Sequence, residues 1–200
     1  HDALPIFFTE LKPLVKEIEV IRGNHDGNLD PLLPEGIKVL PSSGTIVDDV
    51  GFFHGHRWPS PALLKCKTIV MGHVHPVIAF RDPAGFRITR QVWVKANCDK
   101  EQLTRILLEK NKIKIENSPQ QTLLKHYGVK PKTSQLFIMP SFNEYLGGKP
   151  LNEENSGGEA KSEKIVGPIL RTRAVDLENA EIYLLDGTFL GALSQLRILE

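Results

Sequence analysis

The sequence predicts a protein of the α/β (α+β) class, built as a β-sandwich with helices beside it. Strands alternate with short helices early in the chain, strands dominate later, and polar turns follow several of the buried strands. The chain has 200 residues, of which 40% are hydrophobic and 24% are charged, which suits one domain of ordinary size. This composition excludes a wholly disordered or fibrous chain.

The first half of the chain is expected to alternate helix and strand. Residues 5–17 predict a helix from their apolar spacing, with Thr9 as a candidate cap and Pro13 as a kink or break. A short buried strand over 18–21 runs into a Gly-Asn-His-Asp turn. A Ser-Pro pair predicts the start of a short helix over 62–66. Further strands are expected in IKVLPSS, TIVDDVGFFHGH and KTIVMGHVHP.

The second half is expected to be rich in hairpins. The Asp-Pro-Ala-Gly sequence at 82–85 predicts one hairpin turn, and the Asp-Gly pair at 186–187 predicts another. Between them, Asp99 is expected to cap a helix over 100–110, which has one apolar face. SQLFIMP predicts one more apolar strand, which ends in a polar loop with glycines.

These elements divide the chain into three parts. Residues 1–148 are expected to form the core of the domain, with a basic insertion at about 81–133. Residues 149–164 contain almost no apolar side chains and are expected to form a mobile loop. Residues 165–200 are expected to form a C-terminal hairpin that completes the sandwich.

The net charge of +1 hides an uneven distribution of charged residues. Residues 51–133 carry 15 basic and 5 acidic side chains, whereas both flanking regions are acidic. Such a block is compatible with a polyanionic partner, or with a solvated face that acidic neighbours balance in space. The small net charge itself argues against strong non-specific binding of nucleic acid.

Composition also restricts the compartment. No apolar run reaches the ~18 residues of a membrane span, and no signal peptide is recognisable. Cys66 and Cys98 are the only cysteines, which is too few for a disulfide framework. We therefore expect a reduced, cytoplasmic protein with no membrane partner, and its composition is compatible with an oligomer.

Metal-ligand side chains follow three of the predicted strands. They lie in the segments Gly23-Asn24-His25-Asp26, His54-Gly55-His56 and Gly72-His73-Val74-His75. If the strands are neighbours, the three clusters converge at one edge of the sheet, and Gly72 is expected to make the turn before its histidines. Imidazole suits Zn, Fe, Mn or Ni, and an amide oxygen suits a harder cation, so the pattern predicts a mixed site. Alternatively, the loop histidines are satisfied by backbone groups.

The same segments, in the same order, resemble a known family. GNHD, FFHGHRWP, VMGHVHP, RQVWVK, IMPSFNEYLGG and AVDLENAEIYLLDGTFLG are similar to the calcineurin-like metallophosphoesterases, and to an archaeal branch related to the SbcD-type exonuclease. The resemblance extends from about residue 18 to residue 191. It implies a two-layer β-sandwich flanked by helices, two divalent metal ions (Mn, Fe, Zn or Ni) and a phosphate-ester substrate. Phosphodiesters, nucleic acid among them, are the favoured substrate class.

The resemblance also implies roles for individual residues. The metal ligands would be Asn24, His54 and His73 for the second ion and His75 for the first. His25 would stabilise the developing charge or protonate the leaving oxygen, and Asp26 would hold His25 in its tautomer and orientation. Two cations about 3.5–4 Å apart would neutralise the anionic phosphodiester and orient an in-line attack.

Three further residues near these motifs are candidates with open alternatives. His56 competes with His54 for the ligand role, and we favour His54 because it directly follows the strand. Arg57 and Asn143 are candidate contacts for metal or substrate phosphate, and a structural hydrogen bond is an equally good explanation of each.

The sequence departs from the family at its start. The family signature begins with Asp-x-His and Gly-Asp motifs, which supply ligands of the first metal and the bridging carboxylate, and neither precedes GNHD here. The sandwich would then lack its first strand or strands. Because neutral ligands offset the charge of a dication poorly, we expect these residues alone to bind metal weakly and hydrolyse phosphodiesters slowly. The alternative function is a non-catalytic binding or assembly module that retains the fold and a residual metal site.

Overall fold

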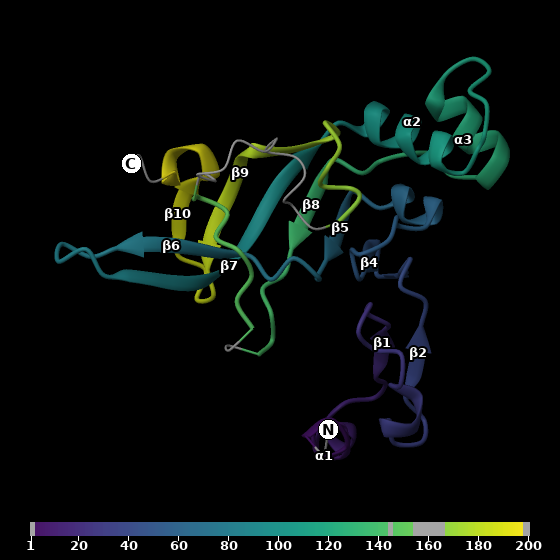
Figure 1. The fold of residues 1–200 in the computed structure, drawn as a ribbon. Coiled ribbons are helices and arrows are strands. Elements are labelled where there is room, and N and C mark those ends of the chain that lie inside the picture. The colour runs from purple at the N-terminus through teal and green to yellow at the C-terminus, as the bar shows by residue number, and fades with distance from the viewer. Residues whose placement is uncertain (1–2, 144–145, 154–166, 198–200) are drawn as a thin grey trace.

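The computed structural model describes residues 3–143, 146–153 and 167–197 (Figure 1). In these residues the strands form one eight-stranded sheet and a separate two-stranded sheet, and a few helices lie beside them. The predicted α+β class is therefore confirmed. No helix in the described ranges is long and apolar enough to cross a bilayer.

The helices and strands follow one another in a fixed order. They are α1 (Ala3–Leu11), β1 (Glu19–Ile21), β2 (Lys38–Leu40), β3 (Thr45–Val47), β4 (Val50–Phe53), β5 (Thr68–Met71), β6 (Val77–Arg81), β7 (Arg87–Cys98), α2 (Lys100–Lys110), α3 (Pro119–Tyr127), β8 (Gln135–Ile138), β9 (Val175–Leu184) and β10 (Phe189–Ala192). Short 3-10 helices occupy Lys12–Leu14, Asp30–Leu32, Pro61–Lys65 and Leu193–Leu196.

The large sheet has the strand order β10-β9-β7-β8-β5-β4-β3, and β6 pairs with β7. Strands β4, β5 and β8 run parallel to one another, whereas β3 is antiparallel to β4, and β7 is antiparallel to β6, β8 and β9. The parallel strands place their carboxyl ends, and the loops that follow them, at one edge of the sheet. Strands β1 and β2 form the separate parallel pair.

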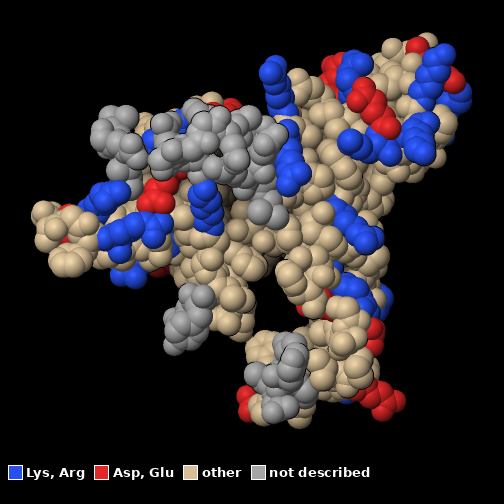
Figure 2. All heavy atoms as spheres, viewed as in Figure 1, with Lys and Arg blue, Asp and Glu red and all other residues tan. Residues whose placement is uncertain are grey.

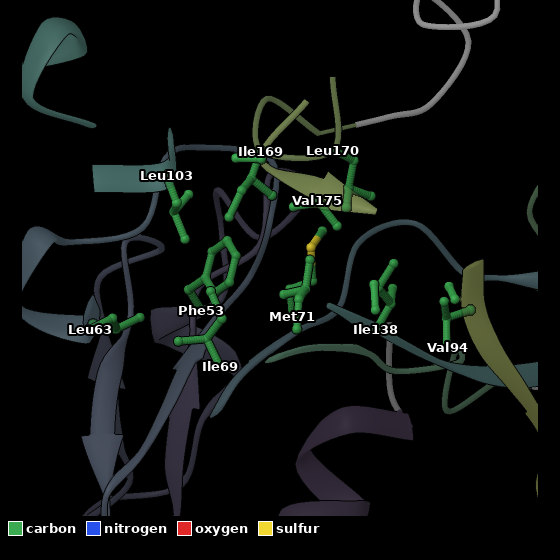
Figure 3. Close-up of a cluster of buried hydrophobic side chains, with 14 of the residues drawn as sticks. Phe53, Leu63, Ile69, Met71, Val94, Leu103, Ile138, Ile169, Leu170 and Val175 are labelled. Carbon is green, nitrogen blue, oxygen red and sulfur yellow. The ribbon is translucent and has the colours of Figure 1, made fainter. Parts of the chain in front are cut away.

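The core lies against the middle of the large sheet. Figure 3 shows Ile69 and Met71 of β5 beside Ile138 of β8, with Val94 of β7 further along the sheet. All four side chains are buried, and Leu103 of α2 is also fully buried in this cluster. The basic stretch 81–133 thus supplies part of the core through β7 and α2.

Local sequence signals account for most helix ends. The Asp99 carboxylate accepts hydrogen bonds from the first turn of α2, as predicted. Helix α1 ends at Leu11, so Pro13 ends the predicted helix early and Thr9 lies inside α1 rather than at its cap. Helix α3 was not expected, although Ser118 caps it and a left-handed glycine follows it.

The segment expected to be a mobile loop, 149–164, begins with anchored residues. Leu151 N donates to Val77 O at 3.0 Å, which lays this segment along β6. The buried Asn152 side chain pairs with both backbone groups of Ala79. Residues 154–164 lie outside the described ranges. Further on, β9 and β10 form the expected C-terminal hairpin.

Candidate metal centre

The ends of β4 and β5 bring three histidines together. Because the two strands are parallel neighbours, His54 and His73 leave the sheet at the same edge, and Gly72 N donates to His54 O at 3.1 Å. The ring centroids are 5.0 Å apart for His54 and His73, 5.0 Å for His54 and His56, and 5.8 Å for His56 and His73. The predicted convergence of these two loops is therefore observed.

The Gly-Asn-His-Asp loop reaches the same place from the separate sheet. Asn24 follows β1, and its Oδ1 lies 3.1 Å from Nε2 of His54. The Asp26 carboxylate accepts the N–H of Gly23 at 2.7 Å and so closes the turn. This bond gives Asp26 a structural role in the loop, and its expected action on His25 stays a prediction.

The other predicted residues surround this group at different depths. His75 lies near enough to His73 for its charge to act on that ring, and His25, which is exposed, does the same. Arg57 is exposed and acts on its neighbour His56.

Asn143 lies on the loop that follows β8, the next strand along the sheet. Its side chain is exposed, and its backbone carbonyl accepts a hydrogen bond from Gln91 Nε2 at 3.1 Å, as the carbonyl of Ser141 does. Gln91 therefore fixes this loop beside the start of β6. Sequence reasoning missed Gln91, which lies within the quoted RQVWVK segment.

The backbone of the third loop is strained at two ligand-type residues. His73 has φ 70° and His75 has φ 50°, both in the left-handed region. The prediction that Gly72 makes this turn is wrong, because the positive φ angles fall on the histidines. Conformations of this kind cost about 1–3 kcal/mol each and cluster at functional sites. They indicate that the surroundings force this loop to present its side chains.

One further glycine holds the strained loop in place. Gly148 N donates to His75 O at 2.9 Å. A Cβ at Gly148 would lie 2.4 Å from His75 O and 2.6 Å from Val74 O, so only glycine allows this approach. The Gly-Gly pair in IMPSFNEYLGG was the signal in the sequence, although its partner could not be read there.

The three clustered imidazoles are held in the neutral form. Burial and the neighbouring His73 and His56 lower the pKa of His54 from 6.5 to about 4. Burial and Arg57 lower the pKa of His56, and burial and His56 lower that of His73. Neutral imidazole is the form that binds a metal ion.

These shifts predict a loss of stability in acid. The folded-state pKa of His54 lies below that of the unfolded chain, so the unfolded state binds more protons between pH 6.5 and about 4. The stabilisation is present above this window and is lost as the pH falls through it. We expect urea unfolding to give a lower free energy at about pH 5 than at pH 7, with a smaller difference for His54→Gln. Equal pH dependence in both proteins would contradict the assignment to His54.

The donor set fits a divalent cation in its chemistry. Nδ1 of His56 is buried and has no hydrogen-bond partner, which is costly unless a further group binds there. Imidazole nitrogens next to an amide oxygen suit Mn, Fe, Zn or Ni. Within the ranges that the structure describes, however, no group of three or more His, Cys, Asp or Glu side chains is arranged to hold an ion. The donors are neighbours, and metal binding would require their side chains to rotate.

Comparisons with known proteins add no relative. The chain matches no protein-family model, no curated protein and no solved structure. A function for this chain is therefore argued from its motifs and from the geometry above.

Proposed function

We propose that this protein is a metal-dependent phosphoesterase of the calcineurin-like metallophosphoesterase type, most of all a phosphodiesterase. The observation that supports the proposal is the meeting of Asn24, His54 and His73 from three separate loops at one edge of the sheets. The left-handed backbone at His73 and His75 supports it as well, because such strain is rarely kept without a function. The two sheets would be parts of the two-layer sandwich of that family.

The proposed roles follow from position. Asn24, His54 and His73 would hold one divalent cation, and His75, on the far side of the strained loop, would serve a second. Divalent cations supply neutralisation of the phosphodiester charge and orientation of an in-line attack. The exposed His25 is free to approach a substrate at the rim and donate a proton to its leaving oxygen.

The surrounding residues would bind and shield the substrate. Arg57 presents a planar guanidinium beside His56, which suits an anionic phosphate oxygen. Asn143 lies on a loop that Gln91 fixes, so its amide could contact the substrate without an added ordering cost.

The experiment that tests this function is hydrolysis of bis-p-nitrophenyl phosphate with Mn²⁺. We expect slow turnover that EDTA abolishes and that added Mn²⁺ restores. Mn²⁺ binding without turnover would favour the non-catalytic module instead. Turnover that survives EDTA, or a chain that binds no Mn²⁺, would contradict the proposal. A parallel assay with the monoester p-nitrophenyl phosphate separates diesterase from monoesterase activity.

A further inference from the structure

The hairpin of β6 and β7 projects from the large sheet as an arm, which we define as residues 77–91 (Figure 1). Its tip is well ordered by its own hydrogen bonds. Asp82 N donates to Phe86 O at 3.0 Å, Gly85 N donates to Asp82 O at 2.9 Å, and Phe86 N donates to the Asp82 carboxylate at 2.8 Å. The arm is therefore a firm ribbon rather than a loose loop.

Two arginines lie directly opposite each other near this tip. The register pairs Arg81 of β6 with Arg87 of β7. Like charges at directly opposite positions of an antiparallel pair destabilise the hairpin. Glu153 offsets part of this repulsion, because its carboxylate accepts from Arg87 Nε at 2.6 Å.

The carboxylate does not balance the cations around it. The hydrogen bond from Arg87 and the charges of Arg81 and Lys149 together lower the pKa of Glu153. Three cations thus face one anion, and Arg90 adds an exposed cation further along β7. Figure 2 shows Lys and Arg gathered on this projecting end, with little acidic surface between them.

An aromatic side chain lies next to the cations. Phe86, beside Arg87 at the tip, is 71% exposed, and Ile88 is 41% exposed. Further along, Tyr183 lies opposite Trp93 of β7, and the rings of Tyr183 and Phe189 are 5.2 Å apart on the same sheet. Planar guanidinium groups suit phosphate oxygens, and exposed aromatic rings suit the faces of unpaired bases.

We propose that the arm is a binding surface for single-stranded nucleic acid, with Arg81 and Arg87 on the phosphates and Phe86 stacked on a base. An anionic membrane is a poorer match, since the tip itself carries the Asp82 carboxylate. The inference deepens the proposed function, because it names nucleic acid as the class of phosphodiester. It also places the binding surface on the strand that follows His75 by way of β6, away from the metal ligands.

The test measures binding and turnover separately. Binding of a fluorescent oligothymidylate and of a duplex is followed by anisotropy in EDTA, at about 50 mM and about 200 mM salt. We expect Arg81→Ala with Arg87→Ala to weaken single-strand binding about tenfold or more and to reduce the slope of log affinity against log salt by about two. Phe86→Ala should weaken the single strand about fivefold or more, and the duplex less.

Two further variants protect the test from misfolding and from a mere charge effect. Glu153→Gln removes the carboxylate between the arginines, so we expect it to strengthen binding, which a damaged fold would not do. Arg105→Ala with Lys114→Ala removes the same charge from exposed positions at α2 and beyond it, and should leave binding nearly unchanged.

The outcomes separate this inference from the proposed function. Equal loss in the arm double variant and in the Arg105 and Lys114 control would overturn the arm as a specific surface. So would loss of binding to phosphatidylserine vesicles with no change toward nucleic acid. Turnover of bis-p-nitrophenyl phosphate should be unaffected by the arm variants. If the chain binds the oligonucleotide through the arm yet shows no metal-dependent turnover, the arm stands and the phosphoesterase proposal fails.

Discussion

Replacing His54 with alanine is expected to lower Mn²⁺ affinity and metal-dependent turnover by about 100-fold or more relative to the unaltered chain. His54 is the residue on which the other elements of the centre converge, because it contacts Asn24 from one sheet and lies beside His73 on the other. Removing a group that orients ligands already costs about 10–100-fold, and removing a ligand itself costs more. Mn²⁺ titration followed by electron paramagnetic resonance measures the affinity directly.

The matched variants separate a ligand from a neighbour. His56→Ala should cost less than His54→Ala if His54 is the ligand, because His56 contacts the group through its ring alone and has no described bond to Asn24. His126→Ala removes an exposed histidine from α3 and should change neither quantity. If His56→Ala proved the more damaging change, the ligand role would pass to His56. If neither variant altered Mn²⁺ affinity, the metal centre would not lie here.

Local elements could be predicted because their determinants lie within a few residues. The Asp99 cap of α2 and the turns at 82–85 and 186–187 depend on hydrogen bonds between near neighbours, and the structure has all three. Helix α3 has equally local signals in Ser118 and Gly128, so its omission was avoidable. The extent of α1 was less predictable, because helical spacing continues past the point where Pro13 ends the helix.

The candidate site depended on contacts that no local pattern contains. The motifs predicted which loops carry ligands, and their convergence required β4 and β5 to be parallel neighbours. Nothing in the sequence placed β1 and β2 in a sheet of their own, with Asn24 reaching His54 across 30 positions. The strain at His73 was also hidden, because the backbone of a histidine adopts positive φ only when distant groups such as Gly148 hold it there.

Replacing Gly44 with alanine is expected to destabilise the fold by about 2–6 kcal/mol, the largest stability effect that we predict for a single methyl group. Gly44 has φ +102°, where an L side chain is strained, and an added Cβ would lie 2.0 Å from the backbone oxygen of Phe52. That oxygen belongs to β4, so the methyl group cannot be accepted by rotation of a flexible side chain. The free energy of unfolding from urea denaturation measures the effect.

Two other glycines divide this effect into its parts. Gly187 also has a positive φ, +87°, but a Cβ there meets nothing within 4 Å, so Gly187→Ala should cost only the conformational term of about 1–3 kcal/mol. Gly27 has neither feature and Gly27→Ala should be nearly neutral. A loss at Gly44 no larger than at Gly187 would mean that the edge formed by β3 moves to admit the methyl group. Because Ser42 O accepts the N–H of His54 at 3.2 Å, such a movement would also shift His54 and weaken Mn²⁺ binding.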